Sequence, residues 1–244
     1  MLFHHKQRCI DSFIPDLSIC GNAIDYVSTF NFLGLIIDEH ISFEPHIQSV
    51  SNRISRSLGI LNKLKRFLPH HILLMLYNSL ILPHLQYSIL CWGYKTTRLF
   101  KLQKRAMRII TCSKYNAHTD PIFKKLKLLK IADIYNICLL KFYYKFKKDN
   151  LPHYFRDIVS FSSGHQYFTR GQNKPNYTYC RTSHAKHSIR NYLPAFLNST
   201  PNIITDKIDT HSLKGFSNYC KVYYISRYQD CCNIANCYVC SQQT

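Results

Sequence analysis

Residues 44–66 read EPHIQSVSNRISRSLGILNKLKR, and the spacing of the apolar side chains in this stretch decides the fold class. Apolar residues recur every three or four positions, at Ile47, Val50, Ile54, Leu58, Leu61 and Leu64. This spacing places them on one face of an α-helix, and Pro45 suits a first helical turn, where a missing backbone N–H costs no intrahelical bond. The stretch therefore predicts a long amphipathic helix with one buried face.

The helical pattern continues on the C-terminal side of this stretch to about residue 150. Further helices are predicted over residues 71–82, 84–91, 98–112, 120–128 and 131–148. The sequence then becomes rich in Ser, Gly, Asn, Pro and Tyr, which predicts a linker or extended loop. Two short helices are expected within residues 187–229, before a cysteine-rich tail.

On the N-terminal side the sequence alternates and turns. Gly21-Asn22 separates two short apolar runs, and the glycine tolerates the positive φ of a tight hairpin. Residues 30–37 predict an apolar strand that ends at Asp38, whose side chain is expected to cap the turn into the helix. The predicted fold class is therefore mainly α, with a small N-terminal β-hairpin and strand element, a helical bundle and a less regular C-terminal segment.

The 244-residue chain has 32 Lys and Arg against 13 Asp and Glu, which gives a formal net charge of +19. Its hydrophobic content of 46% is enough for a core, so the charge belongs to a folded surface. Such a surface repels itself and is best tolerated beside a polyanion. Nucleic acid is the expected partner, with an acidic protein or a lipid surface as the alternative.

Cysteine usage and the N-terminal sequence predict an intracellular chain, cytoplasmic or nuclear, and not a secreted one. The first residues, MLFHHKQRC, do not resemble a signal peptide, and eleven cysteines, an odd count, fit reduced thiols better than a disulfide framework. The uncharged run over residues 67–94 contains prolines and polar residues: Pro69, Asn78, Pro83, His84 and Gln86. We therefore predict a buried helical pair there and no membrane span.

The clearest candidate binding surface lies in residues 98–112, RLFKLQKRAMRIITC. Its cations form one helical stripe about 100° wide, at i, i+3, i+4 and i+7. They are Lys101, Lys104, Arg105 and Arg108, with Leu99, Leu102, Ala106, Ile109 and Ile110 roughly opposite. No acidic residue occurs between Lys95 and Lys114, whereas ordinary exposed helices mix signs. We interpret the stripe as a phosphate-binding surface.

Two further helices carry weaker versions of this pattern. Arg53, Arg56 and Lys63 flank the apolar face of the first predicted helix. The last helix of the bundle interleaves cations with aromatic residues that could stack on exposed bases: Lys141, Phe142, Tyr143, Tyr144, Lys145, Phe146, Lys147 and Lys148. The spacing of Phe142 and Phe146 favours a place in the core over a stacking role.

The sequence predicts no catalytic residue, metal site or cofactor. Two-metal phosphoryl transfer needs carboxylates that converge on ions about 4 Å apart. The only adjacent acids, Asp38 and Glu39, would point to opposite faces of a strand. No glycine-rich phosphate loop or Gly-x-Ser-x-Gly motif occurs, and nothing marks a Cys/His nucleophilic pair. The histidine doublets at 4–5 and 70–71 have poor geometry for a shared metal.

The tail sequence CCNIANCYVC leaves three alternatives. Cys232, Cys237 and Cys240 match the start of a plant-type iron–sulfur motif, although no distant fourth cysteine follows. Together with Cys231 they could ligate zinc, with Cys220 or His211 replacing one of them. The simplest alternative, free thiols without a bound metal, is the one we adopt.

Several segments resemble, in order and spacing, the LINE-type (non-LTR, jockey-like) retrotransposon reverse transcriptases. MLFHH resembles the strand after the fourth conserved block of the palm, and NFLGLIIDEHISF resembles the primer-grip block. LYNSLILPHLQYSILCWG, LQKRAMRIITCSKYNAHTDPIF and DIYNICLLKFYYKFKKDNLP resemble the segments that follow. The resemblance covers residues 1–160 well and residues 185–226 loosely.

This resemblance implies a division of the chain into four parts. Residues 1–43 would be the end of a palm, residues 44–159 a helical thumb-like domain, residues 160–186 a linker, and residues 187–244 short helices with the cysteine tail. The paired aspartates of the family's palm are absent from the sequence.

The resemblance also implies roles for individual residues. Phe32, Leu33 and Gly34 would form the primer grip, and the basic stripe would follow the phosphates of a template–primer duplex. Two positions depart from the family pattern, since Leu197 stands where Trp is usual and Tyr87-Ser88 where Tyr-Gly is usual.

We therefore predict a fragment of a retrotransposon RNA-directed DNA polymerase that binds the backbone of RNA or DNA and lacks the polymerase active site. In an intact element, its further partner would be the rest of the polymerase. Two alternatives stay open. The chain could be an independent basic RNA- or DNA-binding or assembly module, or a non-functional remnant of a decayed mobile element.

Overall fold

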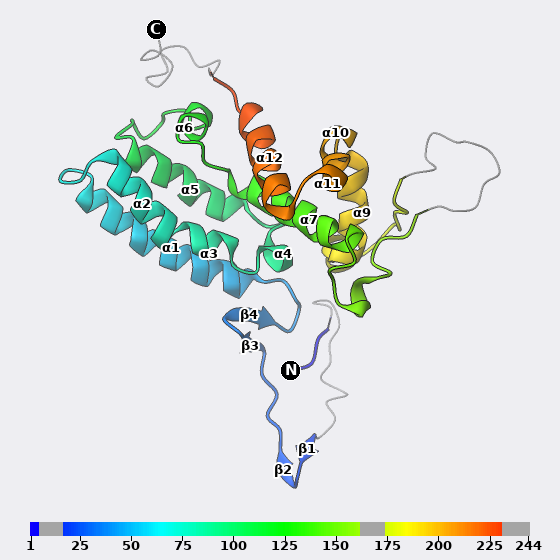
Figure 1. The fold of residues 1–244 in the computed structure, drawn as a ribbon. Helices are drawn as coiled ribbons and strands as arrows, with labels where there is room; N and C mark the ends of the chain where they lie inside the picture. Colours follow the sequence, from blue (N-terminus) through cyan, green and yellow to red (C-terminus); the bar gives the residue numbers. More distant parts are fainter. Residues whose placement is uncertain (5–16, 162–173, 231–244) are drawn as a thin grey trace. The chain divides into compact units, whose positions relative to one another are not determined.

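A computed structural model of the chain describes residues 1–4, 17–161 and 174–230, with Ser183 described by its backbone only. It is mainly helical and has two small antiparallel hairpins near the N-terminus (Figure 1), so the predicted fold class is confirmed. The chain divides into two compact units, Met1–Asn52 and Arg53–Thr244. The four-part division drawn from the family resemblance stays a prediction.

The first unit contains a hairpin in which β1 (Ser18–Ile19) pairs with β2 (Asn22–Ala23). Cys20 and Gly21 form its two-residue turn, with φ angles of 49° and 81°. Positive φ at both central residues gives the twist that suits a tight hairpin, and glycine adopts it without a Cβ clash. The predicted hairpin is confirmed, but its turn lies one residue earlier than Gly21-Asn22.

Residues 30–37 form part of a second hairpin, so the prediction of a single strand is wrong. β3 (Thr29–Phe32) pairs with β4 (Leu35–Asp38), and the chain reverses at Leu33 and Gly34, whose φ angles are 49° and 85°. Apolar residues in both strands and at the turn hid this reversal, because only Gly34 is a typical turn residue. β4 buries Leu35, whereas every residue of β3 is exposed.

The carboxylate of Asp38 caps the turn between β4 and helix α1 (Glu44–Leu64), as predicted. Its Oδ1 accepts a hydrogen bond from the backbone N–H of Phe43 at 2.7 Å, and its Oδ2 accepts one from Ser42 at 3.1 Å. Burial opposes ionisation of Asp38, but these hydrogen bonds outweigh it and hold the pKa of the carboxyl below its ordinary value. The charged carboxylate therefore stabilises the turn.

Changing Asp38 to Asn should destabilise the first unit by about 1–2 kcal/mol at neutral pH, because it weakens charge-assisted hydrogen bonds. The folded pKa lies below the unfolded value of about 3.9. The stabilisation is therefore full above that value and is lost as the pH falls through the folded pKa. Hydrogen exchange at the Phe43 amide, measured against pH, checks this. Asp25→Asn, at an exposed position of the same unit, is the control and should leave that exchange unchanged.

Helices make up most of the second unit. After the end of α1, its first part contains α2 (His70–Leu80), α3 (Leu82–Gln86), α4 (Ile89–Trp92), α5 (Thr97–Ile110), α6 (Asp120–Lys125) and α7 (Ile131–Lys147). The apolar face predicted for α1 is buried at Ile47, Val50, Ile54, Leu58 and Leu61 and half-buried at Leu64. Helical spacing therefore identified the buried side of this helix correctly.

The helix predicted over residues 84–91 is interrupted, so the prediction of one continuous helix is wrong. α3 ends at Gln86, Tyr87 is extended, and Ser88 has a left-handed φ of 49° before α4 begins. The indole N–H of the fully buried Trp92 donates a hydrogen bond to the Tyr87 carbonyl at 3.0 Å. The buried side chain of Trp92 therefore stabilises the interrupted backbone through this hydrogen bond.

The side-chain amide of Gln103 joins three elements in the middle of the second unit. Its nitrogen donates hydrogen bonds to the Tyr77 hydroxyl of α2 and to the Leu129 carbonyl, each at 2.9 Å. Its oxygen accepts a hydrogen bond from the backbone N–H of Ile131, the first residue of α7, at 2.9 Å. Gln103 itself lies on α5 and is fully buried, so each polar atom of its amide has a partner inside the core.

The C-terminal segment belongs to the second unit and contains more helices than the two predicted. After a 3₁₀ turn (His153–Phe155), they are α8 (Ser183–His187), α9 (Ile189–Ser199), α10 (Asn202–Thr205), α11 (Lys207–Thr210) and α12 (Leu213–Ser226).

Helix α12 packs against α7. The ring of Phe216, which is fully buried, stacks at 5.5 Å on the ring of Tyr144. Just beyond α12, the Tyr228 hydroxyl accepts a hydrogen bond from the backbone N–H of Lys130 at 3.0 Å and donates one to the carboxylate of Asp133. The end of the described chain is thereby bonded to the start of α7.

No helix within the described ranges is long and apolar enough to cross a membrane. The four tail cysteines, Cys231, Cys232, Cys237 and Cys240, lie outside the described residues, as do residues 162–173 of the predicted linker. Within the described part of the predicted linker, Phe161 and Pro175 pair in an isolated antiparallel β-bridge.

Changing Gln103 to Leu should lower the free energy of unfolding by roughly 2–5 kcal/mol, because each buried polar group left without a partner costs about 1–3 kcal/mol. The groups affected are the N–H of Ile131, the carbonyl of Leu129 and the hydroxyl of Tyr77. Urea denaturation followed by circular dichroism measures the change. Gln86→Leu is the matched control at an exposed position, and an equal loss in both variants would contradict the role assigned to Gln103.

Candidate nucleic-acid interface

Helix α5 carries three of its four predicted cations on its solvent side. Lys101 and Arg105 are exposed, and Lys104 is half-buried with its ammonium 4.4 Å from the centre of the Phe100 ring. The opposite side of the helix is buried as predicted, at Leu99, Ala106, Ile109 and Ile110, with Leu102 half-buried. The buried Gln103 and Met107 complete that side. The helix therefore presents a basic face, formed by Lys101, Lys104 and Arg105, opposite an apolar face.

Four acidic residues of the second unit form ion pairs with cations outside the basic face. Ion pairs join Lys124 to Asp230, Lys130 to Asp120, Arg156 to Asp149, and both Lys147 and Lys148 to Asp209. Within the described part of the chain, none of these pairs involves the basic face of α5. Its charges are therefore available to an external anion.

Arg108, the fourth predicted phosphate contact, is half-buried and also makes contacts within the chain. Its Nε donates a hydrogen bond to the backbone carbonyl of Ala117 at 2.9 Å, and its guanidinium lies 6.0 Å from the Tyr115 ring. Burial lowers the pKa of this guanidinium, against an opposing contribution from Tyr115, although an arginine stays charged at neutral pH. Helical spacing could not reveal this, because the partner lies in the loop after α5.

The cations predicted on α1 are also exposed. Arg53, Arg56 and Lys63 lie on one side of the helix, and Ile60, which is 49% exposed, lies among them. Arg53 is close to His84 of α3, where burial and the arginine charge together lower the pKa of the imidazole. These residues form a second, sparser set of cations.

Helices α1, α2 and α5 run alongside one another in the second unit (Figure 1). The Ser57 hydroxyl of α1 donates a hydrogen bond to the Leu80 carbonyl at the end of α2, and α2 packs on α5. The two sets of cations are therefore carried by helices connected through α2.

The predicted primer-grip residues lie in the first unit, at the tip of the β3–β4 hairpin. Phe32 ends β3, and Leu33 and Gly34 form the turn. Leu33 is 79% exposed and Phe32 is 55% exposed, so the tip presents apolar side chains to solvent. An exposed apolar tip fits a contact surface better than a core element.

The aromatic residues of α7 pack within the protein. Tyr143 and Tyr144 are buried, Phe142 meets the Phe155 ring at 5.5 Å, and Phe146 stacks on Tyr143 at 6.1 Å. Phe142 and Phe146 are half-buried and not part of the buried core, although both make ring contacts within the protein. Base stacking on α7 accordingly has no support from the geometry.

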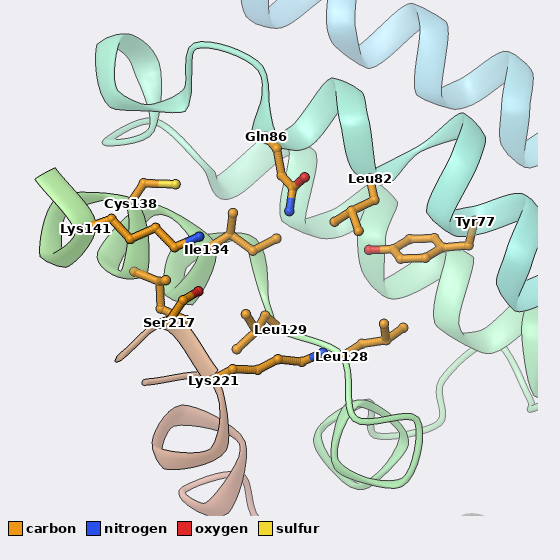
Figure 2. A pocket seen from close by; sticks show the side chains of 11 residues that line it. Tyr77, Leu82, Gln86, Leu128, Leu129, Ile134, Cys138, Lys141, Ser217 and Lys221 are labelled. Carbon is orange, nitrogen blue, oxygen red and sulfur yellow. The ribbon is translucent and has the colours of Figure 1, made fainter. Parts of the chain in front are cut away.

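A cavity of about 190 Å³ lies between α2, α3, α7 and α12 (Figure 2). Apolar residues such as Leu82 and Ile134 line it, together with the side chains of Lys141 and Lys221 and the thiol of Cys138. The sequence did not indicate this cavity, because its two lysines lie on different helices and are 80 positions apart in the sequence (221 − 141).

Two described thiols are poor nucleophiles because they are shielded from solvent. Burial raises the pKa of the half-buried Cys138, and it raises the pKa of the fully buried Cys220 to about 12. A thiol is nucleophilic and binds metal as the thiolate, so these two cysteines are protonated at neutral pH. Cys220 is for the same reason a poor substitute ligand for a zinc site in the tail.

Comparison with protein-family models, with curated proteins and with solved structures found no match to this chain. The resemblance to LINE-type reverse transcriptases therefore rests on the sequence segments quoted above.

Changing Arg108 to Ala should destabilise the second unit by about 1–2 kcal/mol, because it removes a hydrogen bond to the carbonyl of the buried Ala117. The salt dependence of nucleic-acid binding should stay as in the unchanged chain. Urea denaturation and a salt titration of duplex binding measure the two effects. Arg105→Ala, on the exposed side of the same helix, should cost less than about 0.5 kcal/mol and serves as the control.

Proposed function

We propose that the chain binds the sugar–phosphate backbone of nucleic acid along the basic face of α5. The observation that carries the proposal is the placement of Lys101, Lys104 and Arg105 on one solvent-facing side of α5, without an ion-pair partner among the described acids. Arg53, Arg56 and Lys63 on α1 supply a second set of contacts.

The electrostatics of this face favour a polyanion. Neighbouring cations at i, i+3 and i+4 repel one another by about 0.2–0.5 kcal/mol for each pair. A phosphate backbone turns this repulsion into attraction, and the release of condensed counterions adds to the affinity. The excess of 19 positive charges over the whole chain acts in the same direction. An acidic protein would supply fewer and less regularly spaced negative charges.

The sequence resemblance suggests which nucleic acid is bound. In a LINE-type reverse transcriptase, a helical thumb holds the template–primer duplex and a primer-grip hairpin contacts the primer end. We propose the same division of roles here, with α5 on the duplex backbone and Phe32, Leu33 and Gly34 as the hairpin contact. The chain would bind this duplex without catalysing nucleotide addition itself, and the rest of a polymerase would be its partner.

The test replaces Lys101, Lys104 and Arg105 with Ala together. Loss of three phosphate contacts should reduce the slope of log affinity against log salt by about 2.7 on duplex DNA, from roughly 0.9 for each contact. The loss should be similar for duplexes of unrelated sequence, because phosphate contacts do not read bases. Fluorescence anisotropy with labelled RNA–DNA and DNA duplexes over a range of salt concentrations measures the slope.

The control variant removes the same charge from exposed positions on other helices: Lys125→Ala, Lys145→Ala and Lys214→Ala. Its salt slope should fall less than that of the α5 variant. Equal slopes in the two variants would show that net charge alone attracts nucleic acid. Incorporation of nucleotides by the purified chain in a primer-extension assay would contradict the proposed absence of catalysis.

A further inference from the structure

The first unit brings His4 next to Glu39 and His40, an arrangement that the sequence did not indicate. The Nε2 atom of His4 lies 3.6 Å from Oε2 of Glu39, and the Nε2 atom of His40 lies 3.7 Å from Oε1 of the same carboxylate. The two imidazole rings meet edge to face with their centres 4.6 Å apart. One ligand atom from each residue lies within 4.8 Å of the other two. All three residues are half-buried.

Backbone hydrogen bonds hold the cluster in place. The N–H of His4 donates to the Glu39 carbonyl at 3.0 Å, and the N–H of Glu39 donates to the Ser28 carbonyl at 2.9 Å. The first residues of the chain are therefore bonded to the turn after β4. This turn is in addition capped by the carboxylate of Asp38. The three side chains thus converge on a braced segment of backbone.

A backbone carbonyl decides which ring nitrogen of His40 carries a proton. Its Nδ1 lies 3.2 Å from the backbone carbonyl of His4, and a carbonyl can only accept, so Nδ1 carries the proton. In the neutral ring, Nε2 then presents a lone pair toward the carboxylate of Glu39. Two electron-rich atoms facing each other at 3.7 Å repel, and either a proton on Nε2 or a metal ion between them removes this repulsion. A backbone carbonyl that orients the other ring nitrogen is also the usual support of a metal-binding histidine.

We propose that His4, Glu39 and His40 form a binding site for a divalent transition-metal ion, with zinc as the ion that fits best. Two imidazole nitrogens and one carboxylate oxygen are a common zinc ligand set with three protein ligands. A tetrahedral zinc ion about 2.0–2.1 Å from each ligand separates its ligand atoms by roughly 3.4 Å. His4 Nε2 lies 3.6 Å from Oε2 of Glu39 and His40 Nε2 lies 3.7 Å from Oε1, both close to this value. Because the two contacts end on different oxygens, the side chains must shift to bring both nitrogens and a single oxygen onto the ion, starting from ligand atoms that lie within 4.8 Å of one another.

This site was not predicted, because the doublet at residues 4–5 has poor geometry for a shared metal and its other ligands lie far away in the sequence. A shared ion needs ligands whose side chains converge, and the fold supplies these from the turn after β4. Three protein ligands leave a fourth position for water or a small anionic ligand. A bound ion would also cross-link residues 1–4 to the β3–β4 hairpin.

The test is a zinc titration of the untagged, full-length chain by calorimetry. Cys231, Cys232, Cys237 and Cys240 are changed to Ser beforehand, so that thiolates of the tail cannot bind the added metal. One equivalent of zinc should bind. His40→Ala and Glu39→Gln should each weaken that binding at least about tenfold, since loss of even an outer-shell partner typically costs 10–100-fold. His71→Ala, an exposed histidine of the second unit, should leave it unchanged.

A second measurement needs no change to the ligands. Zinc should shift the imidazole nitrogen resonances of His4 and His40 in long-range ¹H–¹⁵N spectra before it shifts those of other histidines. Unchanged resonances at these two residues, or equal affinity in the His40→Ala and His71→Ala variants, would overturn the metal site. The cluster would then be a pair of ordinary histidine–carboxylate contacts.

Discussion

The buried amide of Gln103 is the contact on which the arrangement of the second unit depends. It satisfies the N–H at the start of α7, where a helix leaves its first donors without intrahelical partners. It also fixes the rotation of α5, because the side that carries Gln103 must face α2 and the start of α7. The basic face of α5 is then turned to solvent as a consequence of the core. The hydrogen bonds of Gln103 thus determine both the packing of the helices and the exposure of the candidate interface.

Periodicity predicted the helices well wherever one apolar face was continuous. The apolar faces of α1 and α5 are buried as the spacing of their residues indicated. The errors occur where the backbone leaves the regular conformations without a conspicuous sequence signal. Leu33 and Ser88 adopt left-handed φ angles, and neither residue is a typical choice there. At the second position, the Trp92 indole donates a hydrogen bond to the Tyr87 carbonyl, a side-chain contact that residue preferences alone could not reveal.

In the candidate sites, too, the sequence could not show which side chains would be in contact with one another. Position on a helical wheel found the exposed cations of α5, but it could not show that Arg108 is held by a carbonyl of the following loop. Gln103 resembles any polar residue of a basic helix until its partners on α2 and α7 are known. The cluster of His4, Glu39 and His40 joins residues 35 positions apart (39 − 4), and only the turn after β4 makes them neighbours. Sequence spacing therefore identified surfaces, whereas side-chain partners required the fold.

The contacts of Tyr228 and Phe216 with the region of α7 have a consequence for the order of folding. Tyr228 is bonded to residues 98 and 95 positions earlier in the chain, and Phe216 fills space beside Tyr144. During synthesis, the chain must emerge from the ribosome as far as residue 228 before all of these contacts can form. Until then α7 has an uncovered apolar side, which is a state in which nascent chains associate wrongly or recruit chaperones. The second unit can therefore finish folding only after α12 and Tyr228 have been synthesised.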